Sequence, residues 1–119
     1  MTNKPTQKKK WKSSAFTIKL FNQQILIAKG LTSKDFNVWF AKISGDSNIP
    51  DGDGRPSGRT LFGDGYYAMW TSDGGIRNVA HEATHIAWNL LNDRGVKMDE
   101  EILAYMIGHI TDNYVKELL

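Results

Sequence analysis

One stretch decides both the fold and the candidate site: His81-Glu82-Ala83-Thr84-His85, inside a segment that we expect to be helical from about residue 76 to 92. Its apolar residues recur at helical spacing and form one stripe: Val79, Ala83, Ile86, Ala87 and Leu90. The two histidines are one helical turn apart, so both imidazoles can face a single metal ion. Glu82 between them can then act as the base that deprotonates a metal-bound water.

Outward from this segment, the pattern predicts an α+β fold. We expect a small antiparallel sheet with a short helix, followed by two long C-terminal helices. The predicted strands are residues 16–20 and 25–27, joined in a hairpin, and residues 59–62 and 66–71, joined across a glycine turn. Thr32 and Asp35 have the spacing of a capping box and open the short helix, although residues 36–40 also alternate as a strand would. Asp99 or a neighbour starts the last helix.

Length and composition limit the architecture and the kind of site. The chain has 119 residues, a length that predicts a single domain. We expect this domain at residues 14–119, preceded by a flexible basic arm at residues 1–13. It has no cysteine, so any metal must be held by His, Asp or Glu. We find no membrane-spanning run and no signal-peptide pattern, so we expect a cytoplasmic protein with no membrane partner.

The charges are unevenly distributed along the chain. Residues 1–50 contain nine Lys and two Asp (+7), whereas residues 51–119 contain six Lys or Arg and eleven Asp or Glu (−5). The lysines at Lys8–Lys12 flank Trp11, a composition that can contact nucleic acid. A solvated terminus explains the same run more simply, and the body is net acidic, so nucleic acid ranks last among the expected partners.

The loop at residues 44–58 is long for a small domain and rich in Gly, Asp and Pro, as functional loops often are. Asp46, Asp51 and Asp53 would suit Ca²⁺, but their spacing does not fit an EF-hand.

A zinc enzyme usually needs a third protein ligand. One class of zinc enzyme has a glycine three residues after the second histidine and a third histidine ligand six residues after it. This chain has Trp88 and Leu91 at those positions, so it lacks that ligand. The alternative is a carboxylate from the following helix, and Glu101 is in place to supply one.

At this point the chain resembles a family. His81-Glu82-x-x-His85 followed by Glu101-x-x-Ala104-Tyr105 is similar to the minimal gluzincin type of zinc metallopeptidase, and also to small phage-encoded proteins that carry the same motifs without an assigned function. The resemblance covers about residues 60–110. It implies Zn²⁺ held by His81, His85 and Glu101, with Glu82 as general base. It also implies that strand 66–71 is the edge strand over the metal, where a peptide pairs in extended form.

Helix geometry leaves the third ligand open. His85 lies about 10 Å below the expected end of its helix, whereas Glu101 lies about one turn into the next helix. Tyr105 and His109 lie deeper and at a more suitable level. The motif favours Glu101 over His109, and Tyr105 would then orient Glu101 or stabilise an oxyanion.

Two functions follow. The first is zinc-dependent hydrolysis of a peptide or related amide, with peptide or protein as substrate. The second is a non-catalytic binding module with a structural metal, for example a phage protein that acts on a host factor. Each residue also has a simpler explanation: the histidines as polar positions on a helix flank, and Glu101 as a charge that stabilises a helix start.

Overall fold

A computed structural model describes residues 11–46, 57–63 and 65–119. Its elements, in chain order, are β1 (Lys12–Ile18), η1 (Lys19–Phe21), β2 (Gln23–Lys29), α1 (Ser33–Ser44), β3 (Gly58–Gly63), β4 (Tyr66–Thr71), α2 (Ile76–Asp93) and α3 (Glu100–Leu118). The α+β class is therefore confirmed. No helix in these described ranges is both long and apolar enough to cross a membrane.

The four strands form one sheet in the order β1-β2-β4-β3. The outer pairs β1–β2 and β3–β4 are antiparallel, but the central strands β2 and β4 run parallel. The sheet is therefore mixed, whereas the sequence had led us to expect an antiparallel one. Between β2 and β4 the chain forms α1 and β3, which return it to the end of the sheet where β2 begins. β4 therefore starts at the same end as β2, and the two strands run parallel.

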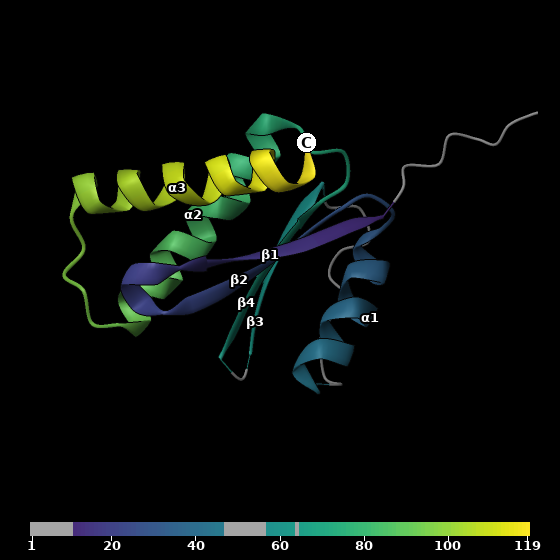
Figure 1. Ribbon diagram of the computed structural model, residues 1–119, viewed down its shortest axis with the longest axis horizontal. Coiled ribbons are helices and arrows are strands. Elements are labelled where there is room, and N and C mark those ends of the chain that lie inside the picture. The colour runs from purple at the N-terminus through teal and green to yellow at the C-terminus, as the bar shows by residue number, and fades with distance from the viewer. Residues whose placement is uncertain (1–10, 47–56, 64) are drawn as a thin grey trace, which may run out of the picture.

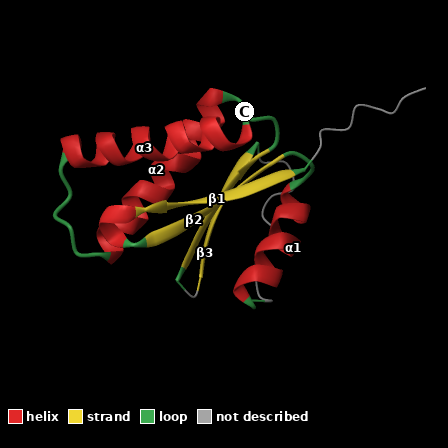
Figure 2. Ribbon diagram, in the orientation of Figure 1, coloured by secondary structure: helices red, strands yellow, loops and turns green. Residues whose placement is uncertain are grey.

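The helices cover the two faces of the sheet unequally (Figures 1 and 2). On one face, α1 encloses a cluster rich in aromatic side chains: Leu26, Ala28, Phe36, Phe40, Ala68 and Trp70. The other face carries α2 and α3 over a larger aliphatic cluster that includes Ile25, Ile27, Met69, Val79, Ile86 and Ile110. Since alternate residues of β2 and β4 point to opposite faces, each central strand contributes to both clusters.

Local signals place the helix starts where the sequence predicts them. The Thr32 hydroxyl accepts from the Asp35 backbone N–H at 3.2 Å, and the Asp35 carboxylate accepts from the Thr32 N–H at 3.0 Å, which completes the capping box. The Asp99 carboxylate accepts from the Glu101 N–H at 2.8 Å and so caps α3. Gly95, just after α2, has a φ of 70° that glycine adopts without strain.

The bounds of β1, β2 and β3 differ from the prediction, and those of β1 differ most. β1 begins at Lys12, so the end of the expected arm belongs to the sheet, and it stops at Ile18, because Lys19–Phe21 forms a 3₁₀ turn. Asn22 closes that turn with a φ of 51°. Most of the loop at residues 44–58 lies outside the described residues, including Asp51 and Asp53, whose spacing does not fit an EF-hand.

A buried tyrosine ties α3 to the sheet. The Tyr114 hydroxyl donates to the Ala28 carbonyl at 2.7 Å and lies 2.8 Å from the Thr71 hydroxyl. Burial raises the pKa of Tyr114 to about 12, an effect that the Thr71 hydrogen bond partly opposes. This contact holds the C-terminal half of α3 against the two central strands.

Candidate functional site

The histidine motif lies on the second and third turns of α2. His81 and His85 are exposed, and their Nε2 atoms are 3.3 Å apart. The apolar stripe of α2 faces the sheet, so the histidines lie on the flank of the helix that faces away from the core.

This separation fits two ligands of one zinc ion. With Zn–N distances near 2.0–2.1 Å and tetrahedral angles, two ligating nitrogens are about 3.3–3.4 Å apart. The donor chemistry fits as well, because neutral imidazole is a preferred zinc ligand. The separation and the donor type of His81 and His85 therefore fit a zinc ion.

The Glu82 side chain is buried and lies against β3. It is only 6% exposed, and its Oε1 accepts a 2.6 Å hydrogen bond from the Thr60 hydroxyl on β3. Oε2 accepts no hydrogen bond from any residue that the structure describes. Because burying a charged carboxylate is costly unless it is hydrogen-bonded, the Thr60 contact is what allows Glu82 to lie here.

Gly58 makes room for this carboxylate. A Cβ atom built on Gly58 would come within 2.9 Å of both Cγ and Oε2 of Glu82. Gly58 does not have a positive φ, so its backbone would accept any residue, and the close approach is what requires glycine. Thr60 therefore holds Glu82 against β3, and Gly58 leaves the space that Glu82 occupies.

The first turns of α2 and the start of β3 enclose a pocket of about 380 Å³. It is lined by Ser57, Gly58, Arg77, Asn78, His81 and Glu82. One of the metal-binding candidates and the candidate base therefore open onto the same space.

The edge strand beside this pocket is β3. β4 (Tyr66–Thr71) lies between β2 and β3, so the expectation that it forms the edge over the metal is wrong. That expectation came from the family resemblance, because alternation and turn signals define a strand without giving its position in the sheet. β3 pairs with β4 on one side only, and the outer side of β3 carries no strand from the described residues.

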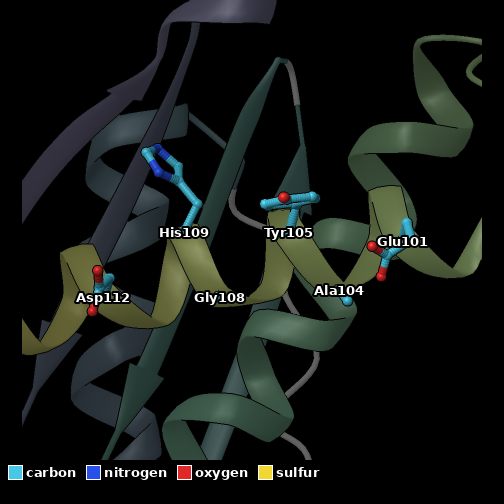
Figure 3. A pocket seen from close by; sticks show the side chains of 6 residues that line it. All are labelled: Glu101, Ala104, Tyr105, Gly108, His109 and Asp112. Carbon is cyan, nitrogen blue, oxygen red and sulfur yellow. The ribbon is translucent and has the colours of Figure 1, made fainter.

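Glu101 and Tyr105 lie elsewhere. Together with Ala104, Gly108, His109 and Asp112 they line a pocket of about 630 Å³ on the outer side of α3 (Figure 3). Within the described ranges, no group of three or more His, Asp or Glu residues is arranged to hold a metal ion. Glu101 as third ligand and Tyr105 as its neighbour stay predictions from the sequence.

His109 faces β1. Its ring packs edge-on against Phe16, with centroids 6.2 Å apart, and the Asn113 amide lies 3.5 Å from its Nε2. With Tyr105 and the 81%-exposed Leu20 it lines a second pocket, of about 590 Å³, between α3 and η1. These contacts give His109 a packing role against β1.

Sequence reasoning missed Thr60 and Gly58. The available signal was a glycine at the start of a predicted strand, which often marks a close approach by another group. A glycine does not show which residue approaches it. Only the packing of β3 on α2 brings Glu82 to that position.

Comparison of the chain with protein-family models, with curated proteins and with solved structures gave no match.

Proposed function

We propose that this protein is a zinc-dependent hydrolase of peptide or related amide bonds, in which His81 and His85 hold the metal and Glu82 is the general base. The observation that supports this most directly is the 3.3 Å separation of the two Nε2 atoms beside a buried, oriented carboxylate. A pair of solvated histidines on a helix flank would not require a hydrogen-bonded acidic residue between them.

Bound zinc would lower the pKa of a water molecule and polarise the substrate carbonyl. Glu82 supplies the proton transfer. The Thr60 hydroxyl donates a hydrogen bond to Oε1 of Glu82. Oε2 of Glu82 is therefore the atom that would take the proton from water and later deliver it to the leaving amine. The Thr60 hydrogen bond orients the carboxylate, and Gly58 leaves room for it.

The substrate would lie along β3. An extended peptide can add to the edge of a strand by main-chain hydrogen bonding, and β3 is the edge strand of the described sheet. The pocket that His81 and Glu82 line lies at the start of β3, beside Gly58. Glu101 as third zinc ligand is part of the proposal on the sequence motif alone, as is the cytoplasmic location.

Zinc content and Glu82→Gln test this function together. We expect about one zinc per chain in protein purified without chelators or a histidine tag, and metal-dependent cleavage of a mixed peptide library detected by mass spectrometry. Glu82→Gln should keep the zinc and lose the cleavage, whereas Ala substitution of both histidines should lose both. Folded protein that takes up no added zinc would overturn the proposal, as would a Glu82→Gln variant that cleaves at the wild-type rate.

A non-catalytic binding module is the second candidate, and the surface of α3 favours it. Tyr105 is 78% exposed and Leu20 81%, and both line the pocket between α3 and η1. Large apolar side chains exposed together often mark a protein-binding surface. A binding module would tolerate Glu82→Gln without loss of function.

A further inference from the structure

The pocket beside the candidate metal ligands contains a cation that the proposed chemistry does not use. Arg77 lies four residues before His81 on α2, so it projects from the same side of the helix one turn, or about 6 Å, closer to the N-terminus. Arg77 and His81 line the pocket together, next to Gly58 at the start of β3.

The Arg77 guanidinium is available to a ligand. Its side chain is exposed, and among the described residues none hydrogen-bonds to it or forms an ion pair with it. Arg59, the other arginine near β3, instead donates to the Ser33 hydroxyl at 3.3 Å on the opposite face of the sheet. Arg77 is therefore an arginine without a partner among the described residues at this pocket, and its planar fork matches a carboxylate in geometry and charge.

The other charged group in the pocket does not satisfy Arg77. Glu82 is buried and directed toward β3, where Thr60 holds its Oε1. The arrangement thus separates a buried base from an exposed cation. This separation allows Arg77 to bind a negative group without removing the base from its position.

The direction of β3 indicates which end of a bound peptide meets Arg77. A peptide that pairs antiparallel with β3, the more favourable arrangement, runs from the Gly63 end toward the Gly58 end. Its C-terminal part then lies over Gly58 and the first turn of α2. The residue that follows the scissile bond would therefore approach Arg77.

We propose that Arg77 is a specificity-determining residue that selects substrates with a carboxylate on the C-terminal side of the scissile bond. The carboxylate is either an acidic side chain or the free C-terminus of the peptide. This inference rests on the proposed hydrolase function and names its substrate class.

The test compares matched peptides with zinc-loaded, full-length protein. The first pair of peptide libraries differs only in a fixed central Glu or Gln, and the second pair carries a free or an amidated C-terminus. We expect cleavage before Glu, or near the free C-terminus, to exceed that of the matched neutral peptide by about tenfold to a hundredfold, as for a charge-assisted hydrogen bond. The pair that shows the preference identifies the source of the carboxylate.

Substitutions of Arg77 test whether this residue causes the preference for a carboxylate. Arg77→Gln should abolish the preference while neutral peptides are still cleaved, and Arg77→Lys should restore part of it. The matched control is Lys97→Gln, which removes an exposed cation from the connection between α2 and α3 and should leave the preference intact. Equal cleavage of the charged and neutral peptides, or a preference that survives Arg77→Gln, overturns the inference while the hydrolase function stands.

A binding measurement separates this inference from a failure of the hydrolase function. Metal-free, ¹⁵N-labelled protein is titrated with N-acetylglutamate and, as control, N-acetylglutamine. We expect the charged probe alone to shift the amide resonances of Gly58, Arg77 and Asn78, and Arg77→Gln to remove those shifts. Identical responses to the two probes would overturn the assignment of Arg77, whatever the outcome of the zinc and cleavage assays.

Discussion

The substitution Gly58→Ala tests the placement of Glu82 without any assumption about function. The added Cβ would lie 2.9 Å from Glu82 Cγ and Oε2 and 3.2 Å from Cδ. Carbon atoms in good contact lie 3.5–4.0 Å apart, so the carboxylate side chain must move. Any movement away from β3 also stretches or breaks the 2.6 Å hydrogen bond from Thr60.

The expected cost combines these two effects. Overpacking a buried site costs about 1–3 kcal/mol, and loss of a hydrogen bond to a charged group costs about 1.5–3 kcal/mol. If Glu82 moves to relieve the clash, the hydrogen bond breaks, and if it stays, the clash remains. Only one of the two costs therefore applies at a time, and they should not be added. We therefore expect Gly58→Ala to lower the free energy of unfolding by about 2 kcal/mol. With an m value of about 1.5 kcal/mol/M, the urea midpoint falls by roughly 1.3 M.

A double-mutant cycle isolates the contact. Glu82→Ala removes the atoms that collide with the new Cβ, so in that background Gly58→Ala should be neutral or slightly stabilising. Gly108→Ala is the matched control: its Cβ would meet nothing within 4 Å, and it lies inside α3, so alanine should stabilise by about 0.5–1 kcal/mol. If Gly58→Ala costs less than about 0.5 kcal/mol, or costs the same with Glu82 absent, Glu82 does not lie against β3 as described.

Three further predictions concern the fold, each measured by urea unfolding. Thr32→Ala removes the capping box of α1 and should cost about 0.5–2 kcal/mol; a cost near zero would show that Asp35 alone caps the helix. Phe36→Ala leaves a cavity among Trp39, Phe40 and Trp70 and should cost about 3–5 kcal/mol, and a smaller value would mean that the aromatic cluster collapses to fill it. Burial raises the pKa of both Tyr114 and Tyr67 to about 12, so the unfolded chain loses these protons first as pH rises above 10. The contribution of these two tyrosines to stability is therefore complete below pH 10 and should be lost as pH rises from 10 to 12; Tyr114→Phe should reduce that loss, and an unchanged pH dependence would contradict the assignment.

Several elements could be predicted because local signals determine them. The strand at Tyr66–Thr71 agrees to the residue, since glycines bound it on the N-terminal side and Ser-Asp-Gly-Gly follows it. The start of α2 at Ile76 and the capping box at Thr32 agree for the same reason. In each case residues adjacent in sequence supply both the pattern and its end.

The strand order could not be predicted, because it depends on contacts between distant residues. β2 pairs with β4 in parallel from Ile25↔Tyr67 to Lys29↔Thr71, a separation of 42 residues, and no turn signal records that pairing. The same long-range contact moves the edge of the sheet from β4 to β3. It also brings Thr60 and Gly58, rather than residues of β4, to Glu82.

The third metal ligand is the part of the site that sequence and structure specify least, and helix geometry explains why. α2 continues for eight residues beyond His85, to Asp93, which is about 12 Å of helix. Glu101 is only the second residue of α3, so a chain that turns back after Asp93 leaves it near the far end of α2 rather than beside the histidines. A ligand at the level of His85 would have to come from about two turns further into α3, and there His109 is directed to Phe16 on β1. The two histidines and Glu82 therefore form a local unit that one helix and one strand specify. Completion of the metal shell depends on how α3 lies against α2, and zinc affinities of Glu101→Gln and His109→Gln, set beside the double histidine variant, measure that dependence.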